Sequence, residues 1–341
     1  MSRKLCPDPI FVMGTPRSGT TLTARILNEH SKIFMPGEVH FFEDIYSRWA
    51  DAGDHALESS RQQIVERLYT IFQRYYEEED QKRIDKMFRD KEELSESIGE
   101  IHNFGQLLDS FIAIQMEADG KTRWGNNVPR DLFHVEDISR FWPRAKAIIC
   151  VRDPRDFLLS YKERWRVTGQ THRARIKSLY HPIVTSFLWK ASVRRAKQIC
   201  EDGTLDYVLL RYEDLVKRPE EEVRKVCFSI EEEFEPKMLR VAVHNSSVAG
   251  EKKGIFQSSV DRWKSHLSQE EIFLVQRIGE KEMRWLGYEP DDAKVNWFRL
   301  AGIVLQTPIA LWRSLSANRD IRGPLLPYLV RRLRPLTKSN F

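Results

Sequence analysis

A glycine-rich segment near the start of the chain has the composition of a phosphate-binding loop. Residues 14–21 read Gly-Thr-Pro-Arg-Ser-Gly-Thr-Thr, the spacing of Gly-x-x-x-x-Gly-Lys-[Ser/Thr] with Thr20 in place of the lysine. Backbone amides of such a loop and of the helix after it form a concave site for one phosphate. The missing lysine is the one that reaches the β and γ phosphates of a triphosphate. Because the loop contains Arg17 instead, it indicates a ligand with one compact phosphate centre and a leaving-group oxygen to neutralise.

A second group of polar residues follows an apolar run further along the chain. Residues 145–151 are apolar apart from one lysine, Arg152 comes directly after them, and Ser160 follows eight residues later. Ligands of open α/β sheets bind at the carboxyl ends of the strands, so Arg152 is expected at that edge, with Ser160 facing back from the next helix. A guanidinium fork and a hydroxyl together suit a dianionic phosphate. The alternative is an exposed turn in which Arg152 pairs with Asp153.

Group transfer also needs a base within hydrogen-bond reach of the attacking group. Glu38 is our candidate, because it follows the strand candidate 32–35 and is expected to open on the same sheet edge as the loop. His40 is the alternative base, since imidazole is the usual one near neutral pH, or else it packs against the two phenylalanines that follow it. Glu43 and Asp44 are interpreted as helix-start residues, which the helix dipole favours.

A parallel sheet would bring these residues to one edge. Apolar runs at 9–14, 145–151 and 205–210 predict buried strands, and helical spacing is present at 20–29, 184–200, 219–230 and 270–286. The strand and helix that flank the loop favour phosphate binding over a plain turn. Alternation of strands and helices predicts an α/β fold with a central parallel sheet flanked by helices, of the phosphate-loop type.

These motifs resemble those of sulfotransferases that use 3′-phosphoadenosine 5′-phosphosulfate (PAPS). Residues 16–22 are similar to the family's 5′-phosphosulfate loop, in the Pro-Arg form of tyrosylprotein sulfotransferases and many bacterial relatives. Residues 148–161 resemble its 3′-phosphate motif. The resemblance continues through Arg-Tyr-Glu-Asp-Leu-Val at 211–216, Asp-Arg-Trp at 261–263 and Leu-Gly-Tyr at 286–288, and so covers roughly residues 9 to 290. It implies transfer of a sulfuryl group from PAPS to a hydroxyl or amine, with release of PAP and no metal.

The resemblance also implies roles for individual residues. The 5′-phosphate is expected to contact Arg17, Ser18, Gly19, Thr20 and Thr21. Arg152 and Ser160 are expected to hold the 3′-phosphate, Tyr212 to lie near the nucleotide, and Lys253 to close over the 3′-phosphate. The glutamate that matches Glu38 acts as base in glycosaminoglycan and tyrosylprotein sulfotransferases, whereas cytosolic sulfotransferases use a histidine, which keeps His40 as its rival. Arg17 is expected to stabilise the charge on the leaving oxygen.

One segment departs from the family's pattern. Residues 124–129 resemble a segment that usually contains Lys-Thr-Pro, but Asn127 and Val128 replace the lysine and threonine. A cationic contact to the sulfuryl group would then be missing. Either Arg17 and the loop amides suffice, or Arg123 or Arg130 substitutes, or activity is weak.

Composition limits the remaining function classes. The chain has 341 residues and a net charge of +5, but residues 291–341 carry nine Lys or Arg against three Asp, so the rest is close to neutral. This distribution argues against nucleic-acid binding. The four cysteines have neither metal-ligand spacing nor the density of a disulfide framework. A reducing compartment is the simpler interpretation, so we expect a cytoplasmic location. We expect a domain at 1–290 with a helical insertion at about 58–119, followed by a basic amphipathic helical tail at 291–341.

The tail and the acceptor leave alternatives open. The uncharged run 300–312 is too short to span a bilayer, so the tail is expected either to lie on an anionic membrane or to pack on the domain. The acceptor could be a small molecule, a carbohydrate, a peptide or a lipid, and the oligomeric state is open. A small-molecule kinase is a second candidate function but lacks the loop lysine, and a non-catalytic nucleotide-binding module on the same fold is a third.

Overall fold

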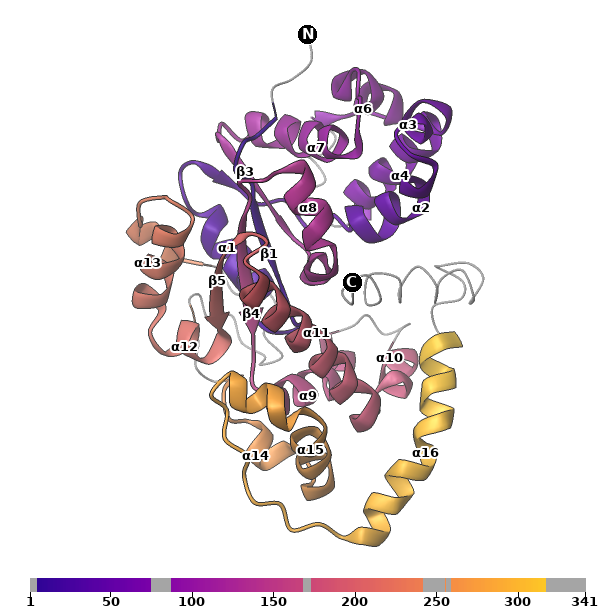
Figure 1. Ribbon diagram of the computed structural model, residues 1–341, viewed down its shortest axis with the longest axis vertical. Helices are drawn as coiled ribbons and strands as arrows, with labels where there is room; N and C mark the ends of the chain where they lie inside the picture. Colours follow the sequence, from indigo (N-terminus) through magenta and orange to yellow (C-terminus); the bar gives the residue numbers. More distant parts are fainter. Residues whose placement is uncertain (1–4, 75–86, 168–172, 242–254, 256–258, 317–341) are drawn as a thin grey trace.

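Parallel strands form a sheet at the centre of the molecule (Figure 1). The computed structural model describes residues 5–74, 87–167, 173–241, 255 and 259–316. In these ranges the strands are β1 (Ile10–Gly14), β2 (Ile33–Phe34), β3 (Arg123–Asn127), β4 (Lys146–Val151) and β5 (Asp206–Arg211). Their order is β2-β3-β1-β4-β5, and every neighbouring pair is parallel. The predicted α/β fold is confirmed.

The central strands are apolar on both faces. Each residue of β1 is buried, and β1 pairs with β4 so that Val12 lies opposite Ile148 and Gly14 opposite Cys150. Continuous apolar runs of this kind are typical of parallel strands that helices cover on both sides. Both strands were predicted for this reason.

Strand β3 is buried in spite of its polar sequence, Arg-Trp-Gly-Asn-Asn. Arg123 at its start donates to the carbonyl oxygens of Asp8 and Ile230, and Asn126 donates to Asp131. Gly125 leaves room for a neighbour, because a Cβ there would lie 2.4 Å from the sulfur of Met35. The strand was not predicted, because it lacks an apolar run and the partners of Arg123 are distant in the sequence.

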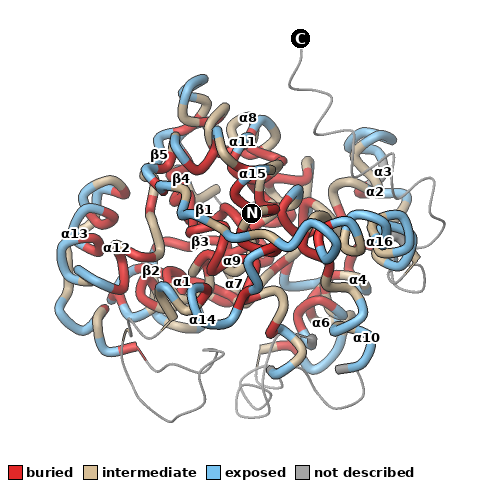
Figure 2. Tube along the Cα trace, turned by 90° about the horizontal axis from the view of Figure 1, so that it is seen from below, coloured by how far each residue is buried: buried red, intermediate tan, exposed pale blue. Residues whose placement is uncertain are grey.

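Helices cover the two faces of the sheet. On one face, Phe11 and Met13 of β1 pack with α7 (Phe104–Ala118), α8 (Val135–Phe141) and α11 (Pro182–Asp202). On the other, Ile10 and Val12 pack with α1 (Thr20–Asn28), α12 (Tyr212–Lys217) and α13 (Pro219–Ser229). Figure 2 shows buried residues concentrated in this three-layer region. The sheet therefore has a separate apolar core on each side.

A group of helices separates β2 from β3. It comprises the π-helix η1 (Phe42–Tyr46), α2 (Ser47–Trp49), η2 (Ala50–Ala52), α3 (His55–Ser59), α4 (Arg61–Arg74), α6 (Lys91–Ile98) and α7. Helical structure thus begins at Phe42, earlier than the predicted insertion at 58. These helices share the core with the α7 face of the sheet, as Leu68, Leu94 and Phe111 do.

The remaining elements lie along the later part of the chain. They are η3 (Pro129–His134), α9 (Pro154–Lys162), η4 (Arg164–Val167), α10 (Arg173–Leu179), η6 (Pro236–Leu239), α14 (Trp263–His266), α15 (Gln269–Trp285) and α16 (Trp297–Ser316). Helix α16 extends along one side of the molecule, beside α10 and α11 (Figure 1). Residues 317–341 of the predicted tail lie outside the described ranges. Within those ranges, no helix combines the length and apolar character that crossing a bilayer requires.

Candidate active site

The glycine-rich loop connects β1 to α1 through an unusual backbone conformation. Gly14, Arg17 and Gly19 have φ values of 141°, 64° and 93°. A Cβ on Gly14 would lie 2.0 Å from the carbonyl oxygen of Cys150, and one on Gly19 would lie 2.6 Å from the ring of Tyr212. Both glycines are therefore needed for close approach of β4 and α12, as well as for their backbone angles.

Hydrogen bonds to the carbonyl oxygen of Cys150 in β4 hold the loop in place. The Thr15 amide and the Ser18 hydroxyl both donate to the carbonyl oxygen of Cys150, over 3.1 and 2.9 Å. The Ser18 amide donates to the Thr15 carbonyl over 3.2 Å. Ser18, predicted to bind the ligand, thus has its hydroxyl and its amide engaged within the scaffold. We interpret Ser18 as a residue that shapes the loop.

The loop leads into an uncapped helix start. Helix α1 begins at Thr20, and no side chain caps its N-terminus. The first amides of a helix have no partner within it, so those of Thr20, Thr21 and Leu22 can donate to an anion. Thr20 is buried and Thr21 is partly exposed. The loop therefore offers several donors next to the side chain of Arg17.

Four predicted ligand-binding residues from distant parts of the chain meet beside the loop. Arg17 donates from Nε to the Ser160 hydroxyl over 3.1 Å. Arg152 donates from Nη1 to the Arg17 carbonyl over 3.2 Å and lies over the Tyr212 ring, 4.4 Å from its centroid. Ser259 completes the cluster, because it accepts from Arg152 over 2.7 Å and bonds the Tyr212 hydroxyl over 2.5 Å. Lys253, the remaining predicted residue, lies outside the described ranges.

The cluster brings two arginines close together. Burial and the nearby charges of Arg152 and Arg164 lower the pKa of Arg17. Among the described residues, no carboxylate forms an ion pair with Arg17 or Arg152, and the buried Nε of Arg152 has no hydrogen-bond partner. Buried cations normally have an anionic partner. The arrangement fits a phosphate or another compact anion.

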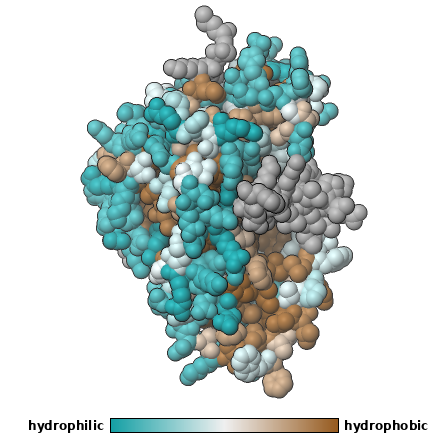
Figure 3. All heavy atoms as spheres, viewed as in Figure 1, coloured by the Kyte–Doolittle hydropathy of each residue, from teal (hydrophilic) through white to brown (hydrophobic). Residues whose placement is uncertain are grey.

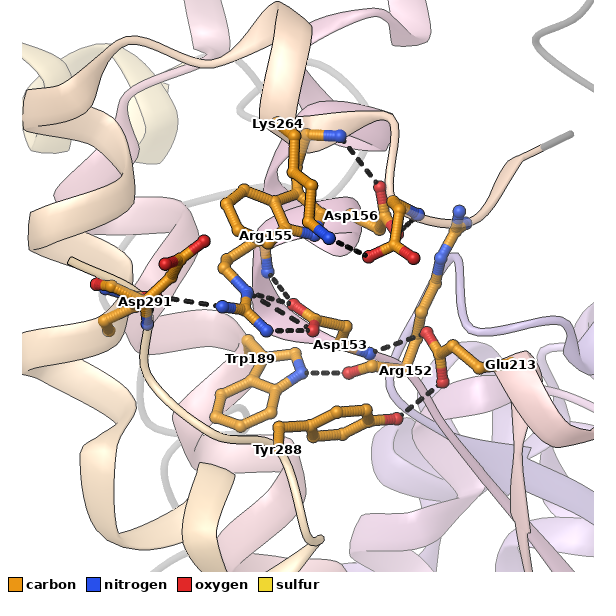
Figure 4. Close-up of polar contacts among 12 residues, drawn as sticks. Arg152, Asp153, Arg155, Asp156, Trp189, Glu213, Lys264, Tyr288 and Asp291 are labelled. Carbon is orange, nitrogen blue, oxygen red and sulfur yellow. Dashed lines mark hydrogen bonds and ion pairs between the residues drawn. The ribbon is translucent and has the colours of Figure 1, made fainter. Parts of the chain in front are cut away.

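The acidic residue next to Arg152 is engaged elsewhere (Figure 4). Asp153 forms an ion pair with Arg155, whose Nη2 lies 2.6 Å from its Oδ2, and Arg155 in turn lies over the Trp263 ring. The Arg152 side chain points away from this pair. The alternative in which Arg152 and Asp153 pair in an exposed turn is wrong.

The motifs at 211–216 and 286–288 support the end of β4 through Glu213 and Tyr288. Glu213 accepts a hydrogen bond from the Asp153 amide over 3.0 Å and another from the Tyr288 hydroxyl over 2.6 Å. Burial raises the pKa of Glu213. Trp189 of α11 donates to the carbonyl of Arg152 over 2.9 Å. Contacts from α11, α12 and the segment after α15 therefore hold the strand end from which Arg152 extends.

The two candidate bases are in contact with each other. His40 Nε2 lies 3.3 Å from a carboxylate oxygen of Glu38, and Nδ1 lies 3.6 Å from one of Glu43. Burial opposes the charged form of His40, but the hydrogen bonds to both glutamates outweigh it and raise the pKa of the imidazole to about 10. Near neutral pH both ring nitrogens are therefore protonated, and His40 cannot accept a proton. The charge of Glu38 partly opposes the lowering of the Arg17 pKa, which connects the Glu38–His40 pair to the loop.

Asp131 is a member of this region that the sequence did not reveal. It is buried in η3, accepts from the Asn126 amide over 2.7 Å, and has a pKa that burial raises well above its ordinary value. The charges of His40, Glu43 and Glu38 all act on it. No sequence signal identifies Asp131, because its neighbours come from a different segment of the chain.

Asn127 ends β3 at the edge of the sheet that carries the loop. It lies opposite Val12 of β1, and its buried side-chain oxygen has no partner in the described part of the chain. Of the two suggested replacement cations, Arg123 lies at the other end of β3, where it contacts Asp8 and Glu232. Arg130 pairs with Glu43. Neither is therefore an unpaired cation beside Asn127.

The acidic and histidine side chains near the loop do not form a metal-ligand set. Across the described ranges, no group of three or more His, Cys, Asp or Glu side chains could hold a metal ion. The cationic group beside the loop is instead suited to anions.

Comparisons with known proteins agree with this arrangement. Residues 9–236 match the sequence profile of the Sulfotransferase family. The chain is 24% identical over 328 residues to the nodulation protein NoeE of Sinorhizobium fredii, a match that covers 89% of this chain and 71% of that protein.

Two solved structures are similar in fold. The sulfotransferase domain from the curacin biosynthetic pathway has a TM-score of 0.52 and 18% identity, covering 84% of this chain and 100% of that one. The sulfotransferase domain from the olefin synthase of Synechococcus PCC 7002 has a TM-score of 0.51 and 18% identity, covering 85% and 98%. These likenesses show a shared fold, and the profile match spans more than half of the chain. The chain belongs to the sulfotransferase family.

Proposed function

We propose that this protein transfers the sulfuryl group of PAPS to a hydroxyl or amine of an acceptor and releases PAP. The observation that carries the proposal is the meeting of Arg17, Arg152 and Ser160 beside the start of α1. A nucleotide with both a 5′- and a 3′-phosphate would account for the amides of the loop and, next to them on the same sheet edge, a second arginine with a hydroxyl. A nucleoside triphosphate would need the missing loop lysine.

The residues present fit such a donor. Amides of the loop and of the first turn of α1 would hold the 5′-phosphate, with the Thr20 and Thr21 hydroxyls. Arg152, through its unpartnered Nε, and Ser160 would hold the 3′-phosphate and favour the 3′-phosphorylated donor. Tyr212 would keep the Arg152 guanidinium in place by stacking beneath it.

Arg17 would then act on the developing charge. Sulfuryl transfer leaves negative charge on the phosphate oxygen from which the group departs, and donors fixed in place before the reaction stabilise that charge best. The guanidinium of Arg17 is held by Ser160, and Arg164 adds to the positive potential around it. We assign to Arg17 and Arg164 the cationic role that a lysine at position 127 would have supplied.

Glu38 would remove the proton from the acceptor. Because His40 is protonated near neutral pH, it serves as the positively charged partner that orients the Glu38 carboxylate. Asp131 and Asn126 would support the pair from the core side. The acceptor itself is a small molecule, carbohydrate, peptide or lipid with a nucleophilic hydroxyl or amine.

The test combines binding with turnover. Calorimetric titration of the full chain with PAP should give a saturable site, and radiolabelled PAPS offered with carbohydrate, phenolic, peptide and lipid acceptors should give labelled product. Absence of PAP binding would overturn the proposal, as would tighter binding of ATP with Mg²⁺ than of PAP, which indicates a kinase. PAP binding without transfer to any acceptor would identify a non-catalytic nucleotide-binding module instead.

A further inference from the structure

Helix α16 (Trp297–Ser316) exposes an apolar surface that the described part of the domain leaves uncovered. Phe298 and Leu305 are 92% and 77% exposed. The other large exposed apolar residues of the helix are Trp297, Val304, Ile309, Leu311 and Trp312. Figure 3 shows an apolar region on this face of the molecule, over α16. Exposed apolar surface of this extent usually marks an interaction site.

The helix is attached to the domain along one side. Leu300 is buried, His181 bonds the carbonyl oxygen of Ile303 over 3.1 Å, and Trp297 packs edge-on against Phe273. The opposite side carries Phe298, Leu305, Ile309 and Trp312, at intervals of seven, four and three residues, which place them on one helix face. We call these four residues the outer face of α16. It remains open while the inner side fixes the helix to α10 and α11.

We propose that the outer face of α16 binds the surface of an anionic lipid bilayer, with the helix lying in the plane of the headgroups. Its two charged residues, Arg299 and Arg313, are both basic. The sequence after the helix, residues 317–341, contributes six more Lys or Arg against one Asp. An interfacial helix that carries basic residues and is followed by a basic segment combines burial of apolar side chains with attraction to anionic headgroups.

The aromatic residues of the helix fit this orientation. Trp297 and Trp312 stand near its two ends and are both exposed. Tryptophan prefers the boundary between hydrocarbon and headgroups, where its ring is apolar on one side and its N–H is hydrated on the other. A helix that lies in this boundary can place Trp312 of the outer face there, and the exposed part of Trp297 lies at the side of the helix, where its ring also contacts Phe273. A helix that spans the bilayer is not an option for α16.

Charge disfavours a second copy of the chain as the occupant. Pairing of two outer faces would bring the basic residues of both copies together, and α16 contains no acidic residue to offset them. An anionic bilayer supplies the opposite charge. The inference does not depend on the proposed sulfuryl transfer.

The test uses the full chain and vesicles of phosphatidylcholine with or without phosphatidylserine. The wild type should float with the anionic vesicles at low salt and lose binding as salt increases. The double variant Phe298→Glu, Leu305→Glu should bind the anionic vesicles at least tenfold more weakly. The double variant Arg299→Gln, Arg313→Gln should bind the vesicles that contain phosphatidylserine more weakly, but should bind the vesicles without it like the wild type. Phe228→Glu is the matched control, because Phe228 is equally exposed but lies on α13, and it should bind like the wild type.

An unchanged unfolding transition would show that each variant is folded. Two results would overturn the inference. One is equal flotation of the wild type and the Phe298/Leu305 variant, or no flotation of either. The other is a concentration-dependent dimer that the same variant abolishes in light scattering without lipid, which would identify a second copy as the partner.

Discussion

The guanidinium of Arg17 donates to the hydroxyl of Ser160 over 3.1 Å, although 143 residues separate them in the sequence. The contact joins the side chain proposed for the 5′-phosphate to one proposed for the 3′-phosphate. Changes at one residue should therefore alter what the other contributes to binding.

A double-mutant cycle for PAP binding measures this coupling. Arg17→Gln and Ser160→Ala should each weaken binding, and the double variant should differ from the sum of the two by about 0.5 to 3 kcal/mol, the range for residues in contact. Dissociation constants from calorimetry give the cycle directly. Additive effects would mean that the two residues act independently.

Arg152 should determine selectivity for the 3′-phosphate. Arg152→Gln should weaken PAP binding about 10- to 100-fold, because a hydrogen bond to a charged group contributes roughly 1.5–3 kcal/mol. Adenosine 5′-phosphate has no 3′-phosphate, so its affinity should change little. Arg277→Gln, on the exposed face of α15, is the control. Equal losses for both nucleotides would place Arg152 elsewhere in the site.

Glu38 should affect turnover more than donor binding. Glu38→Gln keeps the size of the side chain but removes the base, so kcat should fall about 10² to 10⁴-fold, the usual contribution of general-base catalysis. The dissociation constant for PAP should stay within about threefold by the same reasoning. Asp44→Asn is a nearby control, since Asp44 pairs with Arg67. A variant with unchanged kcat would exclude Glu38 as base.

The His40 ion pairs should give a defined pH dependence of stability. The folded-state pKa of His40, about 10, is above the ordinary value of 6.5, so the stabilisation is complete below pH 6.5 and is lost as pH rises through about 10. The difference in unfolding free energy between the wild type and His40→Gln should be largest near pH 6 and shrink toward pH 10. Urea unfolding across this range provides the measurement. His102→Gln, on the surface, serves as control, and a difference independent of pH would contradict the assignment.

Alanine variants at Gly19 and Gly53 distinguish the effect of backbone strain from that of a steric clash. Gly19 and Gly53 both have positive φ, but a Cβ at Gly19 would meet the Tyr212 ring at 2.6 Å, whereas one at Gly53 would meet nothing within 4 Å. Both alanine variants should lower the unfolding temperature, and Gly19→Ala alone should abolish PAP binding. Retained binding in Gly19→Ala would show that Tyr212 can move aside.

Local sequence signals predicted the sheet only where the strands are apolar. The run at 145–151 predicted β4 to within a residue, because burial on both faces requires apolar side chains. β3 escaped prediction because it lacks an apolar run and its buried Arg123 finds partners far away in the chain, at Asp8 and Ile230. The local pattern of apolar and polar residues does not reveal such partners.

Some residues of the candidate site could likewise be predicted from the sequence and others could not. Arg17 and Arg152 were predicted at one edge of the sheet because each follows a predicted strand, and Ser160 was expected to face back from the next helix, whereas Tyr212 was placed near the nucleotide only by the family resemblance. Asp131 was not, because its setting depends on η3 packing against the segment that holds His40. The protonation of His40 likewise depends on the spatial arrangement of two glutamates, and the sequence alone could not separate it from Glu38 as base.

The shared acceptor beneath the glycine-rich loop has a consequence for biosynthesis. Thr15 and Ser18 both depend on the carbonyl oxygen of Cys150, which comes 132 residues after Ser18. A nascent chain that has emerged from the ribosome only through β3 contains every residue of the loop but not the strand that closes it. Contacts so distant in sequence form late. The growing polypeptide should therefore acquire nucleotide affinity only after β4 docks beside β1, rather than gradually as the loop is synthesised.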